Sequence, residues 1–416
     1  MSKLTKIEKS WILYDVGNSA FILIVSTIIP IYFKNLAAQD GISLANSTAY
    51  WGYAASIATI IVMILGPTLG ALGDRRDFKN KLFLTFASLG ALGCFLLSLV
   101  NEGFLFLGMF IIGKVGFNMS LIFYDAMLND ITTHEKMDEI STKGYAFGYL
   151  GSVVPFLFAL IFIMKASVFN LSPAMATKIS FVIIALWWVV FTIPLTRGYR
   201  KKYSQKIHHD EDAPTLMENL QNWKKGILAI KDNKKVMTFL IAFFLYIDGV
   251  YTIIEMATSY GKDMGISDNQ MLLALLLTQF VGFPFAILFG KLAKKYSAIQ
   301  MIQVCILGYM GVAVFALQLD KAWEFWFLAV VVAMFQGGIQ ALSRSYFSKI
   351  VPKERTNEFF SFYDIFGKGA AFTGTLLMSV ATQISGSSKF GLAVIGLLLT
   401  VGYLTFKNHV RKFPAA

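Results

Sequence analysis

Charged residues and cysteines are both scarce in this chain. Only 15% of its 416 residues are charged, and its two cysteines, Cys94 and Cys305, each fall inside an apolar run. Neither a disulfide framework nor a metal site is implied. Four scattered histidines form no HExxH motif, and there is no P-loop and no GxGxxG after a predicted strand. The sequence gives no basis for nucleotide hydrolysis or metal catalysis, so we expect no cofactor and no metal.

Long apolar runs, by contrast, are abundant. Hydrophobic residues make up 56% of the chain, and the mean hydropathy of +0.61 lies above the usual range of soluble proteins. A helix of about 18 apolar residues can cross a hydrocarbon core of roughly 30 Å. About twelve such runs predict an all-α integral membrane protein. The predicted spans are 10–36, 48–72, 81–100, 104–128, 144–165, 174–195, 236–260, 269–292, 299–319, 323–347, 358–384 and 389–408.

The distribution of basic residues predicts the orientation in the cell membrane. The N-terminal "MSKLTKIEKS" runs into the first span without a small-residue cleavage site, which indicates a retained span. Lysine and arginine gather in the loops on the side that holds both termini, including 74–81 and 197–235. The positive-inside rule therefore predicts that both termini are cytoplasmic. The net charge of +12 reflects this asymmetry and gives no reason to expect nucleic acid as a partner.

A long polar segment divides the predicted spans six and six. The predicted domains are an N-terminal six-helix bundle (1–195), a linker (196–235) and a C-terminal six-helix bundle (236–416). Within the linker, "PTLMENLQNWKKGILAIKDNKK" places apolar residues at helical spacing opposite its lysines, which predicts an amphipathic helix. Two roles are open for this helix: an interfacial connector between the halves, or a regulatory segment that binds a partner.

The two halves contain similar segments. The loop "LGALGDRRDFKNK" (69–81) is matched by "FGKLAKKYSAIQ" (289–300), and "ITTHEKMDEIS" (131–141) by "IVPKERTNEFF" (350–360). A six-span repeat is typical of secondary transporters, in which the substrate site lies between the repeats.

Several motifs carry a family resemblance. The loop after the second span resembles the signature of the major facilitator superfamily, with Gly70, Asp74 and Arg75 in matching positions and Phe78 as a departure. The segments "YDVGNSAF", "KGYAFGYLGS", "DGVYTII", "QFVGFPFAILFGKLA" and 337–370 together resemble its vacuole effluxer-like family. Eukaryotic members are similar to autophagy-related vacuolar amino-acid exporters. Since long insertions are lacking, this chain looks like a bacterial member.

The resemblance implies a gate. In the superfamily, a charge relay is thought to hold the inward gate shut, and Asp125, at the end of the fourth span, would join Arg75 in it. Asp74 would face the N-terminus of the eleventh span, where the helix dipole favours a carboxylate. We expect Gly70, Asp74, Arg75 and Asp125 to govern conformational switching without touching the substrate.

Ionisable side chains at membrane depth are candidates for the transport site, because burying them is costly. At 1.5 Å per residue from Val236, Asp248 lies roughly 18 Å into its span, and Glu255 lies roughly 10 Å beyond it on the same face. Tyr251 stands between them. We expect Asp248 to be the central ionisable group. The alternatives are that Asp248 bonds a neighbouring helix and that Glu255 reaches outer water.

Other polar residues reach similar depths. Asp364 and Lys368 are spaced to pair along their helix, either as a structural pair or as part of the site. The remaining candidates are Lys114, Asn118, Gln279, Gln336 and Gln340. The four amides among them can join helices or bind ligand.

The first span also begins with polar residues. Asp15 lies about 8 Å deep and Asn18 about 12 Å, one turn apart on one face. They either form hydrogen bonds to a neighbouring helix or line a polar pathway. We favour the pathway. Gly17 would allow a helix or a ligand to approach closely.

Together these features predict a monomeric, proton-coupled exporter of amino acids or similar zwitterions that works by alternating access. Its expected partners are a small-molecule substrate, protons and the lipid bilayer. A lipid or hydrophobic-drug exporter is the alternative within the same fold. A channel would need a polar ring or filter, and an intramembrane enzyme a nucleophile with a base; neither pattern is present.

Overall fold

The computed structural model describes residues 4–42, 44–75, 78–203, 228, 230–263, 266, 268–385 and 387–414. Nearly all of the predicted amphipathic helix in the linker lies outside these ranges. Its existence and its role remain predictions.

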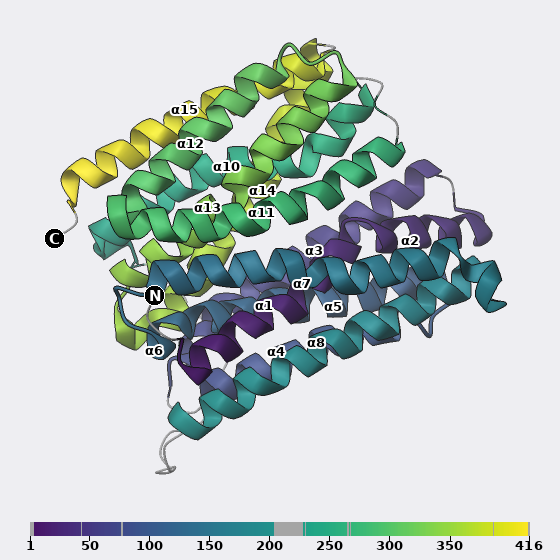
Figure 1. Ribbon diagram of the computed structural model, residues 1–416, viewed down its shortest axis with the longest axis horizontal. Coiled ribbons are helices and arrows are strands. Elements are labelled where there is room, and N and C mark those ends of the chain that lie inside the picture. Colours follow the sequence, from purple (N-terminus) through teal and green to yellow (C-terminus); the bar gives the residue numbers. More distant parts are fainter. Residues whose placement is uncertain are drawn as a thin grey trace. The chain divides into compact units, whose positions relative to one another are not determined.

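All regular structure in the described ranges is helical (Figure 1). The long helices are α1 (Lys6–Val25), α2 (Ile28–Gln39), α3 (Leu44–Gly73), α4 (Phe78–Leu96), α5 (Gly103–Ala126), α7 (Met137–Met164), α8 (Pro173–Tyr203), α10 (Lys234–Asp263), α11 (Asp268–Tyr296), α12 (Ala298–Ala316), α13 (Ala322–Ile350), α14 (Thr356–Ser385) and α15 (Ser388–Lys412). The short elements are α6 (Leu128–Ile131) and the 3₁₀ helices η1 (Ala166–Phe169) and η2 (Lys353–Arg355).

Helices occupy all twelve predicted spans. Within the described part of the chain, ten of the helical segments are long and apolar enough to cross a membrane. Helices α4 and α14, at the third and eleventh predicted spans, are more polar and are not among the ten. Lys79 and Lys81 lie in the first turn of α4, and Asp364 and Lys368 lie within α14.

Two boundaries differ from the sequence predictions. The first span is not one continuous helix, because the backbone leaves the helical region at Thr27, between α1 and α2. Pro30 follows three residues later; it lacks an N–H donor, and its ring clashes with the carbonyl four residues earlier in a continuous helix. In addition, α8 continues to Tyr203, so residues 196–203 of the predicted linker are helical.

The contacts divide the chain into two compact units. Unit 1 contains 1–131, 147–223 and 354–361, and unit 2 contains 132–146, 224–353 and 362–416. The division departs from the predicted halves at two segments: the start of α7 packs in unit 2, and the start of α14 packs in unit 1. That each half is a six-helix bundle remains a prediction.

In unit 1, glycines bring α4 and α5 into backbone contact. A Cβ on Gly116 would lie 2.2 Å from the backbone nitrogen of Gly90, and a Cβ on Gly93 would lie 2.4 Å from that of Gly113. Small residues allow this close packing between membrane helices. Helix α3 docks on α5 in a similar way, since a Cβ on Gly73 would lie 2.6 Å from the ring of Phe123. The contact of Gly73 holds the end of α3 on α5, directly before Asp74.

Candidate functional site

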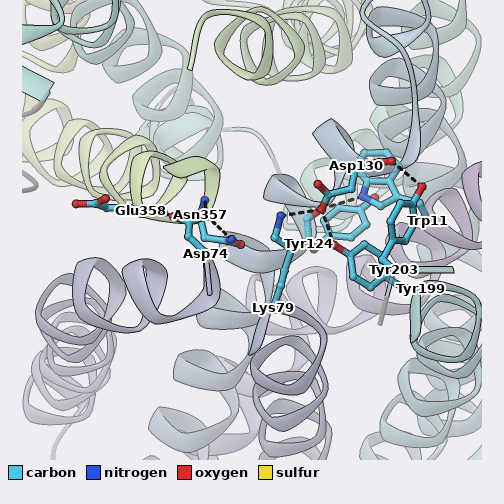
Figure 2. Close-up of polar contacts among 9 residues, drawn as sticks. All are labelled: Trp11, Asp74, Lys79, Tyr124, Asp130, Tyr199, Tyr203, Asn357 and Glu358. Carbon is cyan, nitrogen blue, oxygen red and sulfur yellow. Dashed lines mark hydrogen bonds and ion pairs between the residues drawn. The ribbon is translucent and has the colours of Figure 1, made fainter. Parts of the chain in front are cut away.

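Asp74 binds the N-terminus of α14. Its Oδ1 accepts hydrogen bonds from the backbone N–H (2.8 Å) and side-chain amide (2.6 Å) of Asn357, and its Oδ2 accepts one from the Glu358 N–H (2.9 Å; Figure 2). The first N–H groups of a helix have no intrahelical acceptor and carry the positive end of its dipole. Asp74 therefore lies where the resemblance implied. We call Asp74, Asn357 and Glu358 the Asp74 clamp.

Gly70, one turn before Asp74, makes this approach possible. A Cβ at this position would lie 2.9 Å from the carbonyl oxygen of Asn357 and 3.2 Å from Ser361 Cβ. Both neighbours belong to α14, and the backbone one cannot move without shifting that helix. The match of Gly70 to the signature thus has a steric cause.

The environment of Asp74 favours the protonated carboxyl group. Burial raises its pKa to about 6, although the hydrogen bonds from Glu358 and Asn357 and the positive charge of Lys79 act in the opposite direction. An exposed aspartate has a pKa near 3.9. Asp74 therefore binds a proton more tightly when it contacts α14 than when it is exposed to water. The contact between Asp74 and α14 becomes more stable as the pH falls from 7 towards 5.

Unit 2 contains a related arrangement that uses ion pairs. Glu139, in the first turn of α7, pairs with Lys143 at 2.6 Å and with Lys294 near the end of α11. One turn before Lys294, a Cβ on Gly290 would lie 2.1 Å from Thr142 Oγ1. A glycine therefore permits the close approach here, as Gly70 does at α3.

Arg344 and Asp138 extend this cluster. Arg344 donates from Nε to Ser141 Oγ (2.9 Å) and from Nη2 to the Ser141 carbonyl (3.0 Å). Ser345 Oγ and Lys349 Nζ each donate to Asp138 at 2.7 Å. The start of α7 is thus held to α13 by charged and polar side chains, most of them buried.

This cluster was not among the sites predicted from the sequence, although the repeat carried a signal for it. When "ITTHEKMDEIS" is aligned with "IVPKERTNEFF", Asp138 and Glu139 occupy the positions of Asn357 and Glu358. The chemistry differs between the repeats: backbone N–H groups bind a carboxylate in unit 1, whereas carboxylates bind lysines in unit 2.

Asp248 is completely buried within unit 2, with 0% of its surface exposed. Its Oδ1 accepts a hydrogen bond from Thr252 Oγ1 at 3.3 Å, one turn further along α10. A Cβ on Gly374 of α14 would lie 1.6 Å from the same oxygen. Oδ2 is also buried and has no hydrogen-bond partner within the described ranges. A carboxylate in this setting is expensive to keep charged.

The other two candidates on α10 have different surroundings. Tyr251 is half-buried, and a Cβ on Gly367 of α14 would lie 3.8 Å from its ring. Glu255 is exposed. Asp248 and Glu255 therefore differ strongly in exposure to solvent, and Asp248 is the one whose charge is costly.

Asp364 and Lys368 form the predicted ion pair along α14. Their side chains are 18% and 19% exposed, so the pair is largely shielded from solvent but remains partly accessible to it. The pairing is confirmed, whereas its part in binding remains a prediction.

The remaining candidates inside the helices are mostly half-buried. Lys114 places Nζ 5.7 Å from the centre of the Phe110 ring, and Asn118 is buried one turn later on α5. Gln279 donates to Thr278 Oγ1 at 3.3 Å. Gln336 and Gln340 are half-buried on α13.

Asp15 and Asn18 are both buried on α1, and the Asn18 amide donates to Asp15 Oδ1 at 3.4 Å. A Cβ on Gly148 of α7 would lie 3.5 Å from Asp15 Cβ. A Cβ on Gly17 would lie 2.8 Å from Phe191 Cβ, which confirms that this glycine admits a neighbouring helix, α8. A pathway role for the pair remains a prediction.

Arg75 and Asp125 are half-buried in unit 1, and their charge relay remains a prediction. No group of three or more His, Cys, Asp or Glu side chains within the described ranges is arranged to hold a metal ion.

Solved structures define the class of protein. The human organic anion transporter MFSD10 (TETRAN) matches with a TM-score of 0.72 at 12% identity, over 96% of this chain and 99% of that one. The E. coli fucose:proton symporter FucP matches with a TM-score of 0.70 at 12% identity, over 97% of each chain. The protein has the major facilitator fold.

Sequence comparison narrows this class. The family model described as "Vacuole effluxer Atg22 like" matches residues 44–410. A Bacillus subtilis (strain 168) protein, described as an uncharacterized MFS-type transporter, YxiO, is 40% identical over 407 residues, which cover 97% of this chain and 94% of that protein. The chain therefore belongs to the Atg22-like vacuole effluxer family, as the resemblance predicted.

Proposed function

We propose that this transporter exports amino acids or similar small zwitterions from the cell by proton-coupled alternating access. It acts as a monomer in the cell membrane with both termini in the cytoplasm. The observation that carries this proposal is Asp248, a fully buried carboxylate with a single hydroxyl partner in the described ranges.

The surroundings of Asp248 favour a proton as the coupling ion. A sodium ion would need several oxygen ligands and room around them, whereas the backbone of Gly374 lies directly against Oδ1. A proton needs only the carboxylate itself. Burial disfavours the charged form, so Asp248 holds a proton until an opening of the site hydrates it.

The ion pair on α14 supports a zwitterionic substrate. Asp364 and Lys368 present opposite charges one helical turn apart, at partly exposed positions. The ammonium group of an amino acid can replace Lys368 as the partner of Asp364, while its carboxylate binds Lys368. An exchange of partners avoids leaving either buried charge uncompensated.

The polar contacts at the starts of α14 and α7 form the proposed gate. The Asp74 clamp and the Glu139 cluster each hold the first turn of a helix, α14 or α7, through polar contacts that water can replace. We propose that they form in one conformation of the cycle and are released in the other.

Proteoliposomes test the proposal. A thermal-shift screen of the purified protein against amino acids, peptides, lysolipids and drugs first identifies a ligand, because a ligand that binds only the folded state stabilises it. Uptake driven by an imposed pH gradient is then compared with substrate exchange. Asp248→Asn should lose gradient-driven uptake and retain exchange, since exchange needs no net proton movement. The control Asp320→Asn, at an exposed acid in unit 2, should behave like wild type.

Two results would contradict the proposal. Gradient-driven uptake at the wild-type rate in Asp248→Asn would remove Asp248 from proton coupling. Stabilisation by lysolipids or hydrophobic drugs, with none by amino acids or peptides, would replace the proposed substrate class.

A further inference from the structure

One face of α8 is exposed along the second half of the helix and changes along it from apolar to basic. Val190 and Ile193 are exposed on this face, and Arg197, Arg200 and Lys201 follow them and are also exposed. The spacing of three or four residues places these side chains one above the other on the helix. We call Arg197, Arg200 and Lys201 the basic end of α8.

Contacts elsewhere on α8 fix the rotation that exposes this face. Tyr199 lies on the side of the helix opposite Arg197, and its hydroxyl donates to Asp130 Oδ2 on α6 at 2.5 Å. A Cβ on Gly198 would lie 3.1 Å from Ile7 Cδ1, so the start of α1 packs against α8 at the same level. The basic end is therefore held away from the neighbouring helices of unit 1.

Within the described ranges, no acidic side chain forms an ion pair with the basic end. The two acids that lie nearest along the packed elements have other partners. Glu8 Oε2 accepts from the Thr5 N–H at 2.7 Å, and Asp130 pairs with Lys79 at 2.7 Å. The negative end of the helix dipole offsets about half a charge, so roughly two and a half positive charges remain for an external anion.

The basic end lies at the expected depth of lipid headgroups. Helix α8 is long and apolar enough to cross a membrane, and Lys178 lies near its start. At 1.5 Å per residue, the helix rises about 28 Å from Lys178 to Arg197. This distance matches a hydrocarbon core of roughly 30 Å, so the two cations mark its boundaries. Val190 and Ile193 then contact acyl chains directly beneath Arg197.

We propose that the basic end of α8 binds one anionic phospholipid, whose acyl chains pack along Val190 and Ile193. The planar guanidinium groups of Arg197 and Arg200 bind the phosphodiester oxygens, and Lys201 adds a third positive charge. The lipid belongs to the leaflet on the side of the N-terminus, because the start of α1 packs at this level. In the proposed orientation this is the cytoplasmic leaflet. The inference is independent of the transported substrate.

Two neighbouring lysines provide a matched test. Lys201 lies on the basic face, whereas Lys202 is exposed about 100° further round the helix, with Nζ 5.0 Å from the centre of the Tyr203 ring. Both substitutions, Lys201→Gln and Lys202→Gln, remove one charge. Native mass spectrometry of the full-length protein from neutral detergent gives the stoichiometry and the dissociation constant for phosphatidylglycerol and for phosphatidylcholine with the same acyl chains. Thermal unfolding in the same detergent checks that each variant is folded.

The wild-type protein should bind one phosphatidylglycerol more tightly than phosphatidylcholine. One Lys or Arg beside an anionic lipid strengthens binding by about fivefold. Arg197→Gln and Lys201→Gln should therefore each weaken phosphatidylglycerol binding by about fivefold and leave phosphatidylcholine binding unchanged, whereas Lys202→Gln should change it by less than about twofold. Arg197→Lys keeps the charge but loses the planar fork, so its loss should be smaller than that of Arg197→Gln.

Several results would overturn the proposal. Equal losses in Lys201→Gln and Lys202→Gln would show a diffuse attraction between basic residues and anionic lipid, without a site. Equal affinity for the two lipids would remove the role of the headgroup charge. Displacement of the lipid by an equal concentration of inorganic phosphate would show that the acyl chains contribute nothing. Binding that appeared only in the triple variant Asp210→Asn/Glu211→Gln/Asp212→Asn would assign the basic end to the acids of the linker.

Discussion

Replacing Asp74 with alanine should release the start of α14. The substitution removes the acceptor for two backbone N–H groups and one side-chain amide. In the first turn of a helix no other backbone acceptor is available to these N–H groups, so water must take the place of the carboxylate.

The magnitude follows from the contacts. Leaving a buried donor without an acceptor costs about 1–3 kcal/mol. Asp74 is half-buried, so water restores part of each lost bond, and we expect a net loss of about 2 kcal/mol for the clamp. That loss corresponds to a roughly 30-fold increase in the exchange rate of the Asn357 and Glu358 amides. Asp74→Asn keeps one acceptor oxygen and should raise the rate only about 5-fold.

Hydrogen exchange of the 356–361 segment checks this result, with a peptide from the middle of α5 as the internal reference. The rate should rise in the α14 peptide and stay unchanged in the reference. Equal exchange in wild type and Asp74→Ala would show that the carboxylate does not protect these amides. A global rise in exchange would indicate unfolding and would also refute a local clamp.

Four further outcomes are expected. Because burial raises the pKa of Asp74 to about 6, protection of the clamp amides in wild type should increase as the pH falls from 7 to 5, and this dependence should vanish in Asp74→Asn. Gly290→Ala forces a Cβ to 2.1 Å from Thr142 Oγ1 and should lower stability in thermal unfolding by about 1–3 kcal/mol, whereas Gly108→Ala, with nothing within 4 Å, should be neutral or stabilising. Gly374→Ala places a Cβ 1.6 Å from Asp248 Oδ1 and should cost at least as much as Gly290→Ala in the same assay. Arg344→Lys cannot bind Ser141 through a planar fork and should increase exchange at the start of α7 without affecting α14.

Local sequence determined the helices and the contacts within them. The length and apolarity of each run set the helical spans, because a backbone in lipid must satisfy its own hydrogen bonds. The Asp364–Lys368 pair was predictable because residues four apart on a helix are neighbours wherever that helix lies. Pro30 carried the signal for the break between α1 and α2, which the uniform hydropathy of this segment concealed. The position of Asp74 at α14 followed from the signature loop, but only through the resemblance.

Tertiary structure decided which distant residues meet. Helical spacing relates residues on the same helix only, and these contacts join different helices: Asp130 with Tyr199, Arg344 with Ser141, and Asp248 with Gly374. Packing sets the rotation and depth of each of these helices. Glycines control that packing, because they lack the Cβ that would hold two helices apart. Their effect on stability depends on which second helix packs against them, and the local sequence does not specify that helix. Local composition therefore specified which segments cross the membrane, whereas close helix contacts determined the surroundings of each buried charge.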